Sequence, residues 1–285
     1  MNFRAILLHF RLPFSILLMP VYWFAMSQTT TISTSKAIWL GIILHLLLYP
    51  ASNAYNSFFD KDEGSIGGLE KPPAVDKKLF IAAWIVDVIA LILTFVFISP
   101  LCCLALFIYG MVSKAYSHSA IRLKKYPFIS WIVVGFFQGF FIYITVIQAI
   151  TNVSINELLQ VKYCFPALLS SMMLWAVYPI TQVYQHEEDQ KRGDKTLSIV
   201  LGIRGTFLFT MSVFGIAFAG FYLYFSLHDF LLMLVMTTPT LVFFLNWLRK
   251  VWNHPQEANF KQTMWLNILA SLGLNLFYIT LFFMR

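Results

Sequence analysis

The sequence predicts an all-α integral membrane protein with nine transmembrane helices in one bundle. Three observations predict this class. Of the 285 residues, 59% are hydrophobic and only 12% are charged, which is about half the charged fraction of a soluble domain. Nine apolar segments are each long enough to cross a bilayer, which takes about 20 residues. The basic residues gather in alternate loops between these segments. We expect residues 1–285 to form a single transmembrane domain.

The expected spans cover residues 9–28, 37–58, 79–99, 100–116, 128–150, 163–184, 205–226, 229–248 and 264–284. Little more than Ser99 and Pro100 joins the third span to the fourth, which predicts a tight hairpin. Strands are not expected, because the segments are too long and do not alternate apolar with polar residues as barrel strands do. The first span is not followed by an A-x-A-like cleavage site, so we expect it to be retained rather than removed as a signal peptide.

The basic residues test this count of spans. If the chain crosses the membrane at every span, all of its 20 Lys and Arg residues except Lys36, Lys162 and Arg285 fall on one side. The positive-inside rule then places the N-terminus and these loops in the cytoplasm, and we expect the cell inner membrane. The net charge of +7 therefore reflects orientation. No basic run with interleaved aromatic residues lies outside the spans, so we expect no nucleic-acid partner.

Acidic and amide side chains gather at the same face of the membrane. Asn53, Asn56 and Asp60, at the end of the second span, are three and four residues apart and therefore share one face of a helix. Gln182, Gln185 (or His186) and Asp189 repeat this spacing at the end of the sixth span. We expect them to share a helix face too, and the two faces to lie opposite each other.

Two opposed faces rich in oxygen atoms predict a Mg²⁺ site. Mg²⁺ takes hard oxygen ligands, and it often binds through a few carboxylates together with substrate phosphates. Basic side chains nearby would neutralise phosphate oxygens that the metal leaves uncovered; they are Lys71, Lys124, Lys195 and Arg192. Ordinary solvation of loop charges is the simpler alternative, but it does not explain the Asn and Gln residues at the ends of the spans.

At these residues the sequence resembles the UbiA superfamily of intramembrane prenyltransferases. That family has nine spanning helices and two Asp-rich motifs at the cytosolic ends of helices two and six. The first motif, N-D-x-x-D-x-x-x-D, is similar to residues 56–64; the second, D-x-x-x-D followed by Gly and a basic residue, is similar to residues 185–195. The stretch that begins at Tyr116 resembles the family's basic loop before helix five. The resemblance implies one helix bundle around a central cavity.

The match to the two motifs is incomplete. Asn56, Asp60 and Asp189 agree with the family pattern. Its other acidic positions hold Ser57, Gly64 and Gln185. Acidic residues one or two positions away would supply the missing oxygens after a local rearrangement, so the number of metal ions is left open. The metal ligands that the resemblance implies are Asn56, Asp60, Asp62, Glu63, Gln185, Glu188 and Asp189.

The resemblance implies a Mg²⁺-dependent prenyltransferase. It would move a prenyl chain from a polyprenyl diphosphate to a lipophilic acceptor, with an aromatic compound as the first choice, while Mg²⁺ assists the departure of diphosphate. Asp60 and Asp189 are the expected catalytic residues on the metal side. The expected diphosphate contacts are Asn56, Lys71, Lys124, Lys195 and Arg122. The expected partners are these two substrates and membrane lipid.

Two other functions stay open. The missing acids would suit a degenerate family member that binds a prenyl lipid without turnover. A membrane transporter is the second alternative, but transporters place charges near the midplane and only Asp87 lies deep in a span here. An acid inside a span is a functional candidate by default, unless it contacts water or a neighbouring helix. Gln138 is either a pocket residue or a helix–helix contact.

Overall fold

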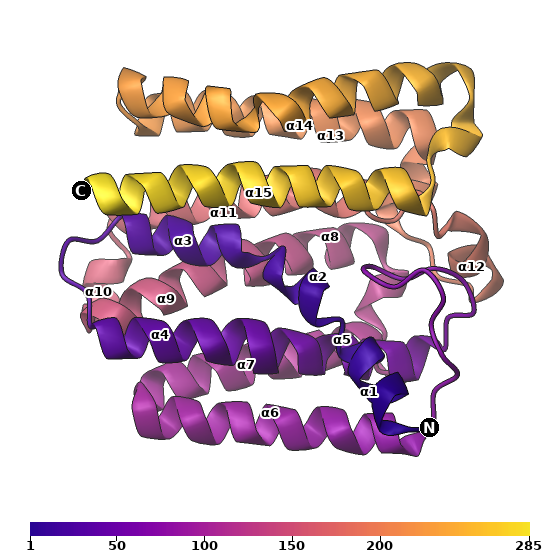
Figure 1. Cartoon of the computed structure of the whole chain (residues 1–285), viewed down its shortest axis with the longest axis horizontal. Helices are drawn as coiled ribbons and strands as arrows, with labels where there is room; N and C mark the ends of the chain where they lie inside the picture. Colours follow the sequence, from indigo (N-terminus) through magenta and orange to yellow (C-terminus); the bar gives the residue numbers. More distant parts are fainter.

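A computed structural model describes all 285 residues of the chain. Its helices run side by side (Figure 1), and nine helical segments are long and apolar enough to cross a membrane. The structure contains no β-strand, and its only extended pairing is a single bridge between Ile66 and Leu69. The predicted fold class is confirmed: this is an all-α integral membrane protein with nine membrane helices in one bundle.

The first span is broken into three pieces, α1 (Phe3–Phe10), α2 (Leu12–Ile16) and α3 (Met19–Ser27). The predicted first span is present, but it is not one continuous helix, because Arg11 adopts a left-handed conformation with φ of 48°, which breaks the helix. Its guanidinium donates to the carbonyl oxygens of Asn53 and Gly67, both at 3.2 Å. The break therefore turns a buried cation toward the interior of the bundle.

The next four spans follow the predicted order. The second consists of α4 (Thr34–Ile42), the π-helix η1 (Ile43–Leu48) and α5 (Tyr49–Asp60). The third and fourth are α6 (Lys77–Phe97) and α7 (Pro100–Ser117), joined by the expected hairpin. The short helix η2 (Leu123–Lys125) leads into the fifth, which consists of α8 (Pro127–Gly135), the π-helix η3 (Phe136–Phe141) and α9 (Ile142–Thr151).

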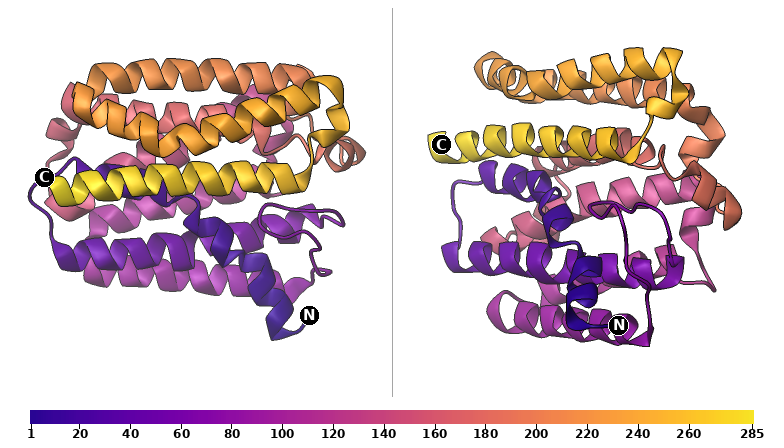
Figure 2. Two further views of the ribbon diagram at one scale, coloured as in Figure 1. Left: turned by 45° about the horizontal axis from the view of Figure 1, so that its top comes forward. Right: turned by 45° about the vertical axis from the view of Figure 1, so that its right-hand side comes forward.

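The second half begins with the short helix α10 (Ile155–Leu158) and the sixth span, α11 (Val161–Ile180). After α12 (His186–Lys191), the last three spans are α13 (Leu197–Tyr224), α14 (Leu227–Asn253) and α15 (Phe260–Met284), with the short turn η4 (Pro255–Glu257) before α15. Figures 1 and 2 show the N-terminus, the loop between α5 and α6, and α12 at one end of the bundle, and the C-terminus at the other.

The sixth span ends earlier than expected. Helix α11 stops at Ile180, and a turn separates it from α12. Gln182, Gln185 and Asp189 therefore do not share the face of one helix, and that prediction is wrong. The His186 imidazole turns away to Ser198, with 2.7 Å between its Nε2 and the hydroxyl oxygen. The break leaves α12 free to cover the end of the bundle.

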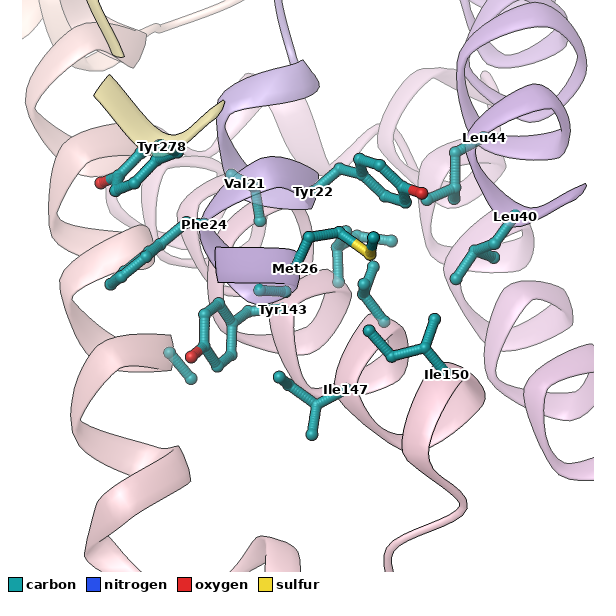
Figure 3. Close-up of a cluster of buried hydrophobic side chains, with 14 of the residues drawn as sticks. Val21, Tyr22, Phe24, Met26, Leu40, Leu44, Tyr143, Ile147, Ile150 and Tyr278 are labelled. Carbon is teal, nitrogen blue, oxygen red and sulfur yellow. The ribbon is translucent and has the colours of Figure 1, made fainter. Parts of the chain in front are cut away.

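Apolar side chains from several helices form a buried cluster, part of which is drawn in Figure 3. Phe24 of α3 stacks on Tyr278 of α15 with their ring centroids 4.6 Å apart, and both are buried with Tyr143 of α9. The Tyr22 hydroxyl donates to the carbonyl oxygen of Ala37 at 2.7 Å, so its polar tip is satisfied within this core. The interior of the bundle around these residues is therefore apolar.

Close backbone packing joins η3 to α11. A Cβ atom at Gly139 would lie 2.5 Å from the backbone of Ser171, so only glycine permits this approach. The Ser171 hydroxyl also accepts from the Phe140 amide at 2.9 Å and donates to the Gly135 carbonyl at 2.8 Å. This contact fixes the π-helical turn that holds Gln138.

The acid inside the third span contacts a neighbouring helix. Asp87 of α6 forms a buried ion pair with Lys114 of α7, and the ammonium lies 4.5 Å from the ring centroid of Trp84. Neither charged residue lines the central cavity. Of the two alternatives for Asp87, the structure supports the helix–helix contact.

Candidate active site

A cavity of about 340 Å³ occupies the centre of the bundle, which is within the usual size range of ligand pockets. Half of the residues that line it are hydrophobic. On α15 the lining runs from Met264 to Tyr278, a distance of roughly 21 Å at the rise of an α-helix. At the end beside α12, which we call the mouth, the lining includes charged residues: Asp60, Asp62, Lys124, Asp189 and Arg192.

The polar face of α5 forms one side of this cavity. Asn53, Asn56 and Asp60 all line it, as their spacing predicts. The Asn53 side-chain amide donates to the Ser15 hydroxyl at 3.0 Å, so it holds α2 in place. The Oδ1 atom of Asn56 is buried without a hydrogen-bond partner. A buried oxygen without a partner costs free energy, so a bound cation or hydrogen-bond donor at this atom would be favourable.

Asp60 is buried and contacts a lysine. The Lys124 ammonium lies 2.5 Å from its Oδ1, and the Arg122 guanidinium lies 3.9 Å from the same atom. Both basic residues come from the stretch between α7 and α8, at η2. The basic loop that the sequence analysis identified therefore reaches the acidic end of α5. Asp62, just beyond that helix end, pairs with Arg192.

Asp189 forms the opposite side of the mouth. It is buried on α12, and its Oδ1 accepts from Arg192 at 2.8 Å. Burial raises the pKa of this carboxyl group to about 6, although the arginine partly offsets the increase. Nearby, the Gln182 Oε1 is buried without a partner, while the Gln185 amide donates to the Ser65 carbonyl at 3.3 Å. The two polar stretches thus face one cavity despite the break between α11 and α12.

Asp194 was not among the candidate residues, yet it is at the centre of the basic side chains. Its carboxylate accepts two hydrogen bonds from Arg122, at 2.7 and 2.8 Å. Burial raises the pKa of Asp194, but the bonds from Arg122 and the charges of Lys124 and Arg192 outweigh it, so the net shift is downward. The only signal in the sequence was its place directly after Gly193 in the second motif.

Other predicted residues lie outside the cavity lining. Glu63, Lys71 and Lys195 are exposed in loops, and their roles remain predictions. Glu188 is half-buried, and its Oε1 accepts from the Gly64 amide at 2.5 Å. A Cβ atom at Gly64 would lie 2.7 Å from that oxygen. The Glu188 carboxylate therefore fills the space that a side chain at position 64 would need.

The oxygen atoms at the mouth suit a hard divalent cation. Carboxylates of Asp60 and Asp189, with the unpaired amide oxygens of Asn56 and Gln182, are ligands that Mg²⁺ prefers. No three acidic, His or Cys side chains converge on one point; the two aspartates are paired with Lys124 and Arg192 instead. A divalent cation bound here would exchange with these basic partners.

Comparison with known protein families gives one decisive match. The model of the UbiA prenyltransferase family matches residues 17–269. This chain belongs to that family. The match includes both polar stretches of the mouth and the basic loop at η2. No curated protein matches the chain.

Solved structures of UbiA homologues share the fold. An apo UbiA homologue from Aeropyrum pernix K1 aligns with a TM-score of 0.69 and 14% identity, over 93% of this chain and 97% of the homologue. One from Archaeoglobus fulgidus, bound to DMAPP and Mg²⁺, aligns with a TM-score of 0.68 and 13% identity, over 99% and 100%. A digeranylgeranylglyceryl phosphate synthase aligns with a TM-score of 0.58 and 17% identity, over 97% and 98%.

Proposed function

We propose that this UbiA-family protein transfers a prenyl chain from a polyprenyl diphosphate to a lipophilic acceptor, an aromatic compound being the first choice. The observation that supports this most strongly is a single cavity that joins a charged mouth to an apolar interior. A prenyl diphosphate has the same two parts, a highly charged head and an apolar chain. It fits the cavity in only one direction, with its head at the mouth.

The head would bind together with Mg²⁺. The A. fulgidus homologue has been solved with DMAPP and Mg²⁺ and with GPP and Mg²⁺, both of which are prenyl diphosphates. Here Asp60 and Asp189 would hold the metal with the Asn56 oxygen. The proposed set also includes Asp62, Gln185 and Glu188, and Glu63 from the exposed loop after α5. Bound Mg²⁺ would stabilise negative charge on the departing diphosphate.

The basic side chains would bind the diphosphate directly. Lys124 and Arg122 already lie within 4 Å of Asp60. With this carboxylate engaged by a metal ion, the charges of Lys124 and Arg122 would be free to pair with phosphate oxygens. Lys71 and Lys195 lie exposed in the adjoining loops and would meet the diphosphate as it approaches.

The apolar wall would hold the prenyl chain and exclude water from the reaction. Phe137, Met173, Leu174, Phe214 and Leu274 line this part of the cavity. The bond between the first prenyl carbon and the diphosphate oxygen breaks, and its electrons leave with diphosphate. The acceptor then forms a bond to that carbon and loses a proton. Exclusion of water protects the electron-deficient carbon from hydrolysis.

The proposal includes the placement of the protein. Residues 1–285 would act as one domain in the cell inner membrane, with the N-terminus and the mouth at the cytoplasmic face. The distribution of Lys and Arg residues supports this orientation.

Binding of prenyl diphosphates to the purified protein in detergent tests the function. We expect wild type to bind at least one chain length in a Mg²⁺-dependent manner, and Asp60→Asn and Asp189→Asn each to weaken binding at least tenfold. Asp229→Asn is the matched control, because Asp229 pairs with Arg285 at the other end of the bundle. If both site variants bind like wild type, the two aspartates do not share a metal–diphosphate site.

A binding protein without turnover is the second candidate. The observation in its favour is that Ser57, Gly64 and Gln185 stand at positions that are acidic in the family motifs. This alternative predicts Mg²⁺-dependent binding but no diphosphate release with any acceptor. Release of diphosphate that depends on an aromatic acceptor would exclude it.

A further inference from the structure

Asp194 lies in the short loop between α12 and α13, where its side chain is only 1% exposed. Gly193 has a φ of 73°, a conformation that suits glycine, and it reverses the chain directly after α12. The Asp194 amide then donates to the Asp189 carbonyl at 2.9 Å. This backbone contact ties Asp194 to the helix that carries Asp189, and the turn directs its carboxylate inward.

Three basic side chains from two different loops converge on this carboxylate. Arg122 contacts both of its oxygens, with distances of 2.7 and 2.8 Å. The Lys124 ammonium is 3.5 Å from Oδ2, and the Arg192 Nε is 3.6 Å from the same oxygen. A two-pronged arginine–carboxylate contact fixes both orientation and distance, so Asp194 sets the position of Arg122 relative to α12.

Lys124 and Arg192 each contact Asp194 and also an acid of the proposed metal site. Lys124 contacts Asp60, and Arg192 contacts Asp189. A bound metal and diphosphate would take over the contacts to Asp60 and Asp189 but not those to Asp194. From this arrangement, and on the basis of the proposed function, we propose that Asp194 is a positioning residue that holds Arg122, Lys124 and Arg192 in place for the diphosphate.

The proposal predicts that removing the Asp194 charge weakens diphosphate binding, which is the opposite of what the change in net charge alone would do. Replacing Asp194 by Asn removes one negative charge beside the diphosphate site. If only the net charge mattered, the variant would bind the anion more tightly. If Asp194 positions the three cations, their mutual repulsion is no longer balanced, they spread apart, and binding becomes weaker.

The experiment compares the binding of GPP with Mg²⁺ to purified wild type, Asp194→Asn and Asp194→Glu, with melting temperatures as a check on folding. We expect Asp194→Asn to bind GPP at least tenfold more weakly. Asp194→Glu should recover part of the affinity because it keeps the charge. Asp229→Asn, which also removes an acid bound to an arginine, should bind like wild type.

Equal or tighter binding by folded Asp194→Asn would overturn the inference while leaving the proposed function intact. If Asp194→Asn does not fold, Arg122→Lys tests the same contact, because it keeps the charge but cannot bind both carboxylate oxygens in the same way. Binding equal to wild type in Arg122→Lys would also overturn it. If wild type binds no prenyl diphosphate of any length, the proposed function fails and the inference fails with it.

Discussion

Each aspartate of the mouth contacts a basic side chain: Asp60 binds Lys124, while Asp62 and Asp189 bind Arg192. Burying a carboxylate without a partner is strongly unfavourable, so these cations make the acidic site compatible with folding. They also lower the affinity for a divalent cation, because the cation must displace them from the carboxylates. The affinity of the site for Mg²⁺ is therefore expected to depend strongly on whether the diphosphate binds at the same time.

The raised pKa of Asp189 leads to a prediction about pH. Its value of about 6 exceeds the ordinary value of 3.8, so the folded chain binds the proton more tightly than the unfolded chain does. Lowering the pH from about 7.5 to about 5 should therefore stabilise the metal-free protein through this group. Over the same interval Mg²⁺ affinity should fall, because a proton competes for the carboxylate.

The measurement is a series of melting temperatures and Mg²⁺ titrations across this pH range, for wild type and Asp189→Asn. Other groups act in the opposite sense, among them His186 and Asp194. Burial lowers the pKa of His186, so its contribution to stability is lost as the pH falls below its ordinary value of 6.5. The depressed pKa of Asp194 matters only in more acidic solution, below about pH 4. Identical pH profiles in wild type and Asp189→Asn would contradict the assignment of the raised pKa to Asp189.

The sequence placed Asp60 at the site because the amide residues before it share its helix face, and the structure agrees. The same spacing also led to Asp189, which lines the cavity although the shared helix predicted for it is absent. Sequence reasoning did not identify Asp194, because the importance of that residue comes from a partner 72 positions away in the chain. Local spacing contains no information about such a contact. Similarly, no pattern indicated that Glu188 would fill the space beside Gly64.

At the scale of the helices, hydropathy predicted the nine spans but not the breaks within them. Hydropathy averaged over about 20 residues does not detect a break at a single residue such as Arg11, or at the turn after Ile180. Both breaks direct polar groups into the cavity. The π-helical turns η1 and η3 have the same apolar composition as the α-helices around them. They depend on close contacts such as that between Gly139 and Ser171, which the sequence alone does not specify.

The ion pair between α6 and α7 provides a test at this scale. Asp87→Ala or Lys114→Ala should each lower the free energy of unfolding by about 3–5 kcal/mol, because each leaves an uncompensated buried charge. The double variant Asp87→Leu/Lys114→Met should be close to wild type in stability, since similar apolar side chains replace both charges. Unfolding in detergent measures all three.

GPP binding gives the control for this test. The double variant should bind GPP like wild type, because neither residue lines the cavity. A double variant that folds normally but loses GPP binding would show instead that this pair supports the site.

For the whole molecule, the sidedness of Lys and Arg predicts the topology. The volume and depth of the cavity do not follow from the sequence, because they depend on how the helices pack.

Two positions on opposite faces of the membrane test the orientation. With the three native cysteines replaced by Ser, Leu159→Cys should react with a membrane-impermeant maleimide in intact spheroplasts, and Lys261→Cys only after lysis. Both positions are exposed. The reverse pattern would place the mouth outside the cell.

The cavity joins a charged mouth to an apolar interior, and under the proposed function this difference in polarity affects the fate of the two products. Cleavage of a prenyl diphosphate would divide one amphiphile into two fragments with different preferred solvents. Diphosphate would dissolve in the aqueous phase at the mouth and be diluted there. The lengthened acceptor would be more soluble in lipid than the acceptor before transfer and would diffuse in the plane of the membrane. The two products would therefore separate by partition, and the reverse reaction would require an encounter across a phase boundary.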